Sequence, residues 1–277
     1  QAELRVADVN LAALHAPLQK TRVSGRVAIE GDRQSQRFDL ALKDPRFDVE
    51  ARAALGGGTL EVQSARVRTG GGAVTASGNL ALEGRKAYRF EGRAQHFDPS
   101  AFVKTTRGDL NFDFVVRGEL ADGIAGEAKV NVSPSTYAGL PASGRINVNG
   151  DRRRIAAADV DVTLGEARVI AKGAFGGAGD ALDLTFRVPS IAAVVKPFGI
   201  AAAGRVEGDA RLTGTFAAPA GRIAFTGSDL VLPSNVYVKA IKARAEAGAD
   251  PASRIDASVQ AIGVAIGKDN PPTKLAE

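Results

Sequence analysis

The chain of 277 residues contains no cysteine, no methionine and no tryptophan. Without cysteine it can form neither disulfides nor thiolate metal sites. No apolar run approaches the roughly 18 to 20 residues that a helix needs to span a bilayer, and no signal peptide is visible at Gln1. Because an initiating methionine is also missing and residues 1–9 read as the middle of a repeat, we expect a piece of a longer protein.

Catalytic motifs are missing as well. The sequence has no Gly-x-Ser-x-Gly, no His-Glu-x-x-His and no Gly-x-x-x-x-Gly-Lys followed by Ser or Thr, so no nucleophile elbow, zinc helix or ATP motor is indicated. His15 and His96 are isolated, and we expect them to be structural or exposed, with no metal or cofactor. The enzymatic alternative is a polysaccharide-acting β-solenoid that uses Asp159 and Asp161, which alternation places on the same side of one strand.

The charge balance is basic but diffuse. The formal net charge is +5, and arginine exceeds lysine by 25 to 11. Such a surface favours anionic partners such as phospholipid headgroups or nucleic acid, although charge spread this thinly is typical of any soluble basic surface, and we expect no nucleic acid. Arg152, Arg153 and Arg154 follow an Asn-Gly-Asp turn signal, so we interpret them as a solvated hairpin turn, with headgroup contact as the alternative.

Three short segments share one pattern, in which a helix-capping residue precedes a single helical turn. The capping residues are Asn10, Asp98 and Ser190. Each side-chain oxygen can satisfy an amide of the first turn. The residue before the cap can pack on an apolar residue of that turn, as Phe97 on Phe102. The caps lie 88 and 92 residues apart (98 − 10 and 190 − 98), so the pattern is a repeat.

A period of about 90 residues favours a stacked, elongated architecture over a compact enzyme. We therefore treat residues 1–266 as one elongated region with approximate repeats 1–95, 96–187 and 188–266. Residues 267–277, which contain two consecutive prolines, are interpreted as a flexible tail.

Between the caps the dominant period is two. Strict alternation of apolar and polar residues occurs at residues 129–132, 145–149, 159–164 and 182–188, and a similar run at residues 210–216 predicts a strand through Phe216. Each run predicts a strand with one apolar and one wetted face. Glycine-rich turn signals separate the runs at short intervals. We therefore predict an all-β chain of about eighteen strands with brief helices.

So many strands cannot form a flat sheet, because strands twist and open sheets seldom exceed about ten strands without curling. The repeat argues against a closed sandwich or barrel, so we expect a curled β-groove whose apolar faces line a trough. The residues predicted to line it are the apolar members of the cleanest alternating runs. They are Val130, Val132, Ile146, Val148, Val160, Val162, Leu164, Leu182, Leu184, Phe186, Leu212 and Phe216.

Several segments carry a resemblance to a known family. The capped segment 97–102, the glycine-led strand 108–118 and the segments 135–144 and 212–219 resemble the C-terminal half of the TamB branch of the AsmA-like envelope proteins. The resemblance covers most of the chain, from about Val23 to Ile266. It implies a long β-groove of the β-taco type with a hydrophobic interior, located in the periplasm of a diderm bacterium.

The resemblance also implies a function and partners. It implies that phospholipid moves between the inner and outer membranes along the groove, or that the protein helps to assemble outer-membrane β-barrel proteins by pairing with strand edges. Anchoring in the inner membrane and docking to an Omp85-type outer-membrane barrel would use parts of the parent chain outside this piece. An apolar groove suits lipid because each acyl methylene gains about 0.8 kcal/mol when it leaves water.

Overall fold

The structure is a computed structural model. It describes residues 1–121, 123–233, 236–250 and 255–267. Strands dominate these residues and the helices are brief, which confirms the all-β prediction. The chain divides into two compact units, Gln1–Gly139 and Leu140–Glu277, here called unit 1 and unit 2.

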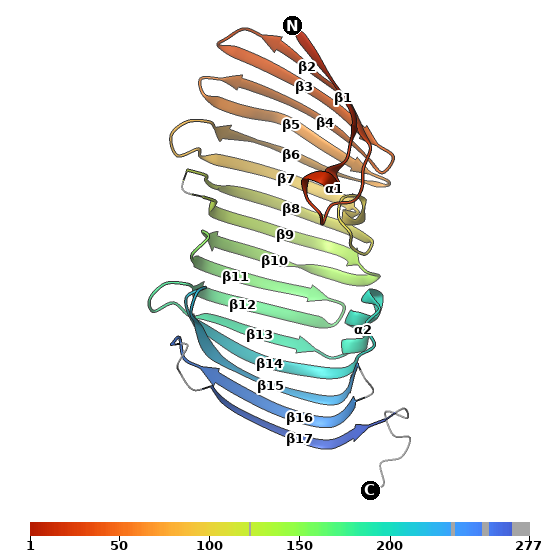
Figure 1. The fold of residues 1–277 in the computed structure, drawn as a ribbon, viewed down its shortest axis with the longest axis vertical. Helices are drawn as coiled ribbons and strands as arrows, with labels where there is room; N and C mark the ends of the chain where they lie inside the picture. Colours follow the sequence, from red (N-terminus) through yellow and green to blue (C-terminus); the bar gives the residue numbers. More distant parts are fainter. Residues whose placement is uncertain (122, 234–235, 251–254, 268–277) are drawn as a thin grey trace. The chain divides into compact units, whose positions relative to one another are not determined.

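Unit 1 is an open antiparallel sheet in which each strand pairs with the next one along the chain (Figure 1). Helix α1 (Leu11–Leu14) follows the first strand, and the 3-10 helix η1 (Pro99–Ala101) follows the seventh. The strands are β1 (Ala2–Val9), β2 (Val23–Gly31), β3 (Ser35–Asp44), β4 (Phe47–Gly56), β5 (Thr59–Thr69), β6 (Gly72–Ala81), β7 (Tyr88–Phe97), β8 (Gly108–Glu119) and β9 (Ala125–Tyr137).

Unit 2 follows the same plan, with each strand antiparallel to the next. Helix α2 (Ile191–Val195) and the 3-10 helix η2 (Lys196–Phe198) lie between its fourth and fifth strands. The strands are β10 (Leu140–Gly150), β11 (Ile155–Leu164), β12 (Ala167–Phe175), β13 (Leu182–Val188), β14 (Ala203–Gly214), β15 (Pro219–Leu232), β16 (Val236–Ala247) and β17 (Asp256–Ile266).

The hairpin between β4 and β5 shows how glycine sets the connections. Its two turn residues, Gly57 and Gly58, have φ values of 54° and 71°. A two-residue turn with positive φ at both positions matches the right-handed twist of the flanking strands, and glycine adopts it without strain. The glycine-rich turn predicted here from sequence is therefore confirmed.

The cap pattern corresponds to a structural repeat within unit 1. Asp8 and His96, each two residues before a cap, have a positive φ of 50°, and strand register shifts at both places. The amide of each is removed from the ladder and bonds to a side chain on the returning strand: Ser24 Oγ at 3.0 Å for Asp8 and Asn111 Oδ1 at 2.9 Å for His96. Two β-bulges therefore recur 88 residues apart (96 − 8) with equivalent partners.

The predicted caps form in all three places. In unit 1, each cap side chain accepts one amide from its own helical turn and one from the start of the return segment. Asn10 thus accepts the amide of Thr21 at 3.2 Å, and Asp98 accepts the amide of Gly108 at 3.2 Å. In unit 2, Ser190 accepts one amide within its helix, at 3.3 Å.

The compact units and the approximate repeats are different divisions of the chain. The boundary between the units lies at Gly139 and Leu140. The repeats 1–95, 96–187 and 188–266 stay a prediction. Most of the expected tail, residues 268–277, lies outside the described residues.

Candidate functional site

One face of each sheet is apolar, because apolar residues alternate along the strands and stay in register across them. In each unit, one row of directly paired residues crosses all the strands. We call the face that carries this row the apolar face of the unit, and the opposite face its charged face. In unit 1 the row contains Leu4, Val27, Leu40, Ala51, Ala65, Ala76, Gly92, Phe114 and Val130. In unit 2 it contains Ile146, Val160, Ala171, Leu184, Ala210, Ile223, Ala245 and Ala257.

The structure places most of the predicted lining residues on these apolar faces. Val130 and Val132 lie on β9 of unit 1, opposite Phe114 and Phe112. The others lie in unit 2, and Leu182 is the buried one among them. Apart from Phe216, the unit 2 set is Ile146, Val148, Val160, Val162, Leu164, Leu182, Leu184, Phe186 and Leu212. Their role as a lipid lining stays a prediction.

Phe216 is the exception, because the strand predicted to carry it ends earlier. Strand β14 ends at Gly214, whose φ is 81°, and the hydroxyl of Thr215 then accepts the amide of Ala218 at 3.1 Å in a turn. Phe216 therefore lies in that turn, and its ring meets the edge of Phe175 with centroids 5.0 Å apart. The prediction of a strand through Phe216 was wrong because alternation alone does not reveal a turn held by a side chain.

Aromatic rings on the apolar faces lie over glycines of the neighbouring strand. A Cβ built on Gly92 would approach Phe114 Cζ to 2.6 Å, and one on Gly208 would approach Phe186 Cζ to 2.8 Å. The rings therefore lie close to the backbone instead of standing upright, and each glycine gives a ring the space it needs.

The apolar faces have little core of their own. Among the described residues, no large side chain is fully buried, and most apolar side chains on the strands are half-buried. A second layer would bury them, as it does in a sandwich. Each sheet is therefore a single layer with a wide apolar surface, which is the arrangement needed to receive an apolar ligand.

The charged face of unit 1 is covered by ion pairs between neighbouring strands. Arg52 pairs with Asp39 at 3.2 Å, and Arg68 pairs with Glu50 at 2.9 Å. These side chains are largely exposed, so each pair contributes only about 0 to 1 kcal/mol to stability. Charged and apolar residues alternate along each strand, so this face is solvated while the opposite face is apolar.

A hollow of about 1100 Å³, which no sequence pattern predicted, is lined mostly by residues of this charged face. Between them, the lining also includes residues of the apolar row, namely Leu40, Ala51, Ala65, Ala76, Gly92 and Phe114. Strands β1 and β2 contribute only Glu3, Arg26 and Ala28 to its lining, and strand alternation puts these three opposite the apolar row. Small residues such as Ala41 and Ser64 form its floor between longer charged ones. The signal that could have revealed it is the placement of small residues at charged-face positions of successive strands.

One end of the unit 1 strands is closed by the segment between α1 and β2, residues 15–22, here called the strap. Figure 1 shows α1 at this end, which we call the capped end; the opposite end is the loop end. The strap pairs with the segment after η1: the Gln19 amide donates to the Phe102 carbonyl at 2.7 Å, and the Lys104 amide donates to the Pro17 carbonyl at 3.2 Å. Because the strap follows β1 and η1 follows β7, the sheet curls at this end.

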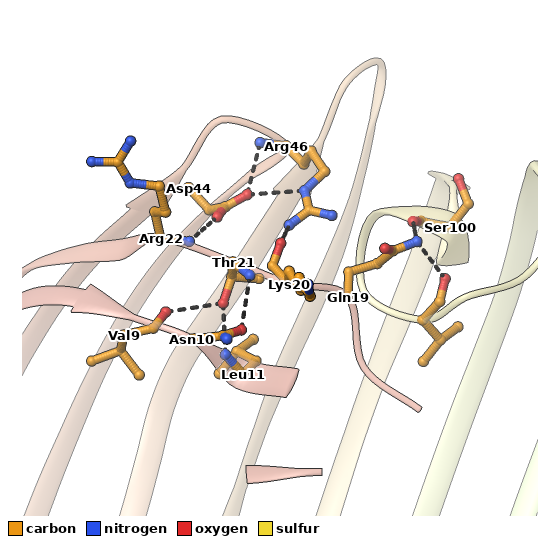
Figure 2. Close-up of polar contacts among 11 residues, drawn as sticks. Val9, Asn10, Leu11, Gln19, Lys20, Thr21, Arg22, Asp44, Arg46 and Ser100 are labelled. Atoms are coloured by element: carbon orange, nitrogen blue, oxygen red, sulfur yellow. Dashed lines mark hydrogen bonds and ion pairs between the residues drawn. The ribbon is translucent and has the colours of Figure 1, made fainter. Parts of the chain in front are cut away.

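A polar network fixes the root of the strap, as Figure 2 shows. The Leu11 amide donates to Thr21 Oγ1 at 2.7 Å, and that hydroxyl donates to the Val9 carbonyl at 2.9 Å. Thr21 is buried, so both of its bonds replace contacts with water that the fold removes. The start of α1 is thereby tied to the residue that leads into β2.

Asp44 forms the second part of this network (Figure 2). Its carboxylate accepts the amides of Arg22 at 2.8 Å and Arg46 at 3.1 Å, as well as the Arg46 guanidinium at 3.2 Å. Burial raises the pKa of Asp44, but these donors together outweigh it, so its pKa lies below the usual range. Arg46 also donates to the Lys20 carbonyl, so the charged pair holds the strap.

Aromatic rings close the capped end from the apolar side. The ring of Phe102 lies 4.4 Å from that of Phe47 on β4 and 5.9 Å from that of Phe97 on β7. The contact with Phe97 confirms the predicted packing of the residue before the cap on the helical turn. The contact with Phe47 joins η1 to a strand three positions away in the sheet, so the apolar face is concave here.

The three consecutive arginines lie in the turn between β10 and β11. Asp151 Oδ1 accepts the amides of Arg153 at 2.6 Å and Arg154 at 2.9 Å, which confirms the turn. The Arg154 guanidinium makes two bonds of 2.8 Å to Asp180 and holds the pKa of that carboxyl below its usual value. Arg152 and Arg153 are exposed. Arg154 therefore ties two turns together, and contact of the other two with headgroups stays a prediction.

The carboxylates of the enzymatic alternative lie on the charged face of β11. Two bonds from Arg168, at 2.8 and 2.6 Å, lower the pKa of Asp161, whereas a general acid needs a raised pKa. Among the described residues, no three His, Asp or Glu side chains gather as a metal site would require. None of the helices in this described part is long and apolar enough to cross a membrane.

Comparison with protein families matches nearly the whole chain. The family model described as TamB, N-terminal domain, matches residues 6–270. The match confirms the resemblance to TamB, but the expectation of its C-terminal half was wrong, because the glycine-led strands and caps that carry the resemblance repeat along the chain and do not mark a position in it. No curated protein and no solved structure matches the chain. The matched stretch includes the strap, all three caps and, apart from Leu4, the apolar rows of both units.

Proposed function

Since the chain belongs to the TamB family of envelope proteins, we propose that its apolar faces shield the acyl chains of phospholipid on their way between the inner and outer membranes. In this proposal the chain works in the periplasm, as part of a larger protein anchored in the inner membrane and joined to an Omp85-type barrel. It binds and guides lipid without a reaction of its own. The observation that carries the proposal is the apolar row that crosses every strand of each unit without a second layer.

The physical argument is the cost of moving lipid through water. Two long acyl chains resist transfer into water by roughly 20 kcal/mol or more. An apolar surface along the route removes most of that barrier, provided that no point on it holds the chains much more tightly than its neighbours. Interchangeable Val, Leu, Ile and Ala side chains, with rings laid flat over Gly92 and Gly208, meet that condition.

Native mass spectrometry with lipid extraction tests the proposal. The chain is purified under mild conditions and compared with Leu184→Asp and Phe186→Asp, both on the apolar face of β13. Thr185→Asp is the matched control, because it places the same charge on the opposite face of the same strand. Far-UV circular dichroism checks that each variant is folded.

We expect phospholipid to copurify with the wild type and with Thr185→Asp, and to be lost from the two apolar-face variants. A folded wild type that carries no phospholipid and takes up none when it is added would overturn the proposal. Equal loss from Thr185→Asp would also count against it, because the effect would then not depend on the apolar face.

A second candidate function is a scaffold for outer-membrane β-barrel proteins, which the edge of unit 2 favours. Among the described residues of unit 2, β17 pairs with β16 alone, and its sequence Asp256–Ile266 contains one charged residue. Val259, Ile262 and Val264 are exposed on it. Natural edge strands normally carry charges or prolines that prevent pairing, so an edge this apolar is suited to receive another strand.

The substitution Ile262→Lys separates the two functions. Ile262 lies opposite Ala240, on the charged face, so a lysine there blunts the edge without charging the apolar face. Pairing is measured by crosslinking to a synthetic amphipathic β-strand peptide. The scaffold function predicts that Ile262→Lys loses the crosslink and keeps its phospholipid; a crosslink that survives contradicts pairing at this edge.

A further inference from the structure

The loop end of unit 1 carries apolar side chains that continue its apolar face beyond the strands. Leu82 directly follows β6, Leu120 directly follows β8, and Ile124 directly precedes β9. Their spacing from Leu80, Gly118 and Gly126 continues the alternation on the apolar side. They are 42, 36 and 62% exposed, respectively. We call these three residues the loop rim.

The capped end exposes fewer large apolar side chains: among the described residues there, Val9 is the exposed one, at 37%. The best-buried residues of unit 1 gather at or near this end, where the strap and the ring of Phe102 cover the apolar face. They are Thr21, Val23, Asp44, Phe47, Thr69, Ala94 and Ala101. An acyl chain entering there would have to displace packed side chains and buried hydrogen bonds, whereas at the loop rim it would meet apolar surface that is already exposed.

Hydrogen bonds hold the loop rim in place. The amides of Leu120 and Ala121 both donate to the Arg85 carbonyl at 3.2 Å, and the Leu82 amide donates to the Gly58 carbonyl at 2.8 Å. The Arg85 guanidinium meets the Glu119 carboxylate at 3.3 Å. Three neighbouring turns are thus tied to one another, and the apolar rim is formed before any ligand arrives.

The turn that follows Leu82 carries a second cation beside Arg85 in the sequence. Lys86 follows Arg85 in the same turn, with a φ of 51°, and its side chain is exposed. Because the Arg85 guanidinium is engaged by Glu119, Lys86 is the cation of this turn that is positioned to meet an anion from solvent. Apolar side chains next to an ammonium group match the two chemistries of a phospholipid, whose acyl chains adjoin a phosphate.

We propose that phospholipid reaches the apolar face of unit 1 sideways across the loop rim, acyl chains first, with its phosphate beside Lys86. The inference rests on the proposed function, in which that face carries acyl chains. The loop rim shields acyl methylenes from water while they cross from a donor membrane to the apolar face. It therefore lowers the activation barrier both for lipid entering that face and for lipid leaving it.

Stopped-flow uptake of a fluorescent acyl-labelled phosphatidylethanolamine from phosphatidylcholine vesicles tests the route. The variant is Leu120→Ser with Ile124→Ser, compared with the full wild-type chain. Val9→Ser is the matched control, because Val9 is exposed at the capped end. Ile124→Leu keeps an apolar side chain at this position, so this variant should take up lipid at the wild-type rate. Equilibrium occupancy of every variant is measured in parallel by native mass spectrometry.

We expect the double variant to take up lipid about tenfold more slowly and to reach an occupancy within about twofold of the wild type. Val9→Ser should match the wild type in both the rate of lipid uptake and the equilibrium occupancy. Normal occupancy with an unchanged rate would overturn the rim as the route and leave the proposed function standing. A wild type that binds no lipid would overturn the proposed function, and the inference with it.

Discussion

Both ends of the strands in unit 1 carry apolar side chains, which are mostly buried at the capped end and exposed at the loop end. At the capped end, the strap, η1 and the ring of Phe102 bury the ends of the strands. At the loop end, the turns are short and the apolar side chains beside them remain exposed. Stability therefore concentrates at one end, and access to the apolar face at the other, which is the usual separation between rigid and ligand-facing parts of a fold.

The largest expected effect is the loss of the aromatic contact at the capped end. Phe47→Ala should lower the free energy of unfolding by about 3 to 5 kcal/mol, because the side chain is buried and its removal leaves a cavity beneath Phe102. Ile124→Ala, at the loop end, should change it by less than about 0.5 kcal/mol. Urea unfolding of both variants measures the difference; similar values would remove the distinction between the two ends.

The buried carboxylate of the strap network should make the capped end sensitive to acid. The pKa of Asp44 is lower in the folded chain than in the unfolded one, so its contribution is present above the unfolded pKa of about 3.9 and is lost as pH falls through the folded pKa. Asp44→Asn should therefore cost about 1 to 3 kcal/mol at pH 7 and progressively less below about pH 4. Urea unfolding from pH 7 to pH 3 tests this; a cost that does not depend on pH would contradict it.

The stability lost when a cap side chain is removed should increase with the number of backbone amides from which that side chain accepts a hydrogen bond. Asp98→Ala should destabilise the chain by about 1 to 2 kcal/mol, because Asp98 accepts the amides of Ser100 and Gly108. Ser190→Ala should cost about 0.5 to 1 kcal/mol, since Ser190 accepts one amide in its helix. Thermal unfolding compares them, with Asp98→Asn as the variant that keeps the acceptor. The reverse order would show that the second bond adds nothing.

A small effect is expected on the charged face. Removing the ion pair between Arg52 and Asp39 by Arg52→Gln should change stability by less than about 1 kcal/mol, because both side chains are exposed. The difference from wild type should shrink further in 1 M salt. Unfolding at low and high salt measures it. A larger, salt-independent loss would mean that this face contributes more to the fold than its exposure indicates.

Local patterns predicted the elements well because the signals are local. A cap acts over three residues and alternation over two, so Asn10, Asp98 and Ser190 could be placed from sequence, as could nearly all of the strands that carry the expected lining residues. Phe216 failed for a reason that is also local: the hydroxyl of Thr215 holds a turn that alternation does not register.

Contacts between distant residues were beyond such reasoning. The strap meets η1 across more than eighty positions, through backbone atoms that any residue possesses, as in the bond from Gln19 to Phe102. Likewise, no pattern in the sequence predicts the contact between Phe47 and Phe102. The closed end, the exposed loop rim and the hollow on the charged face all depend on such contacts.

The sequence by itself determined the all-β class, the three caps and the two-sided chemistry of the strands, because each depends on a period or a cap that can be read within a few residues. Only the tertiary structure decided which end of the unit 1 strands is closed. That outcome depends on the curl of the sheet, which brings Phe102, the residue after η1, beside both the strap at Gln19 and Phe47 on β4. Curl is a sum of small twists over many strands that no single segment encodes.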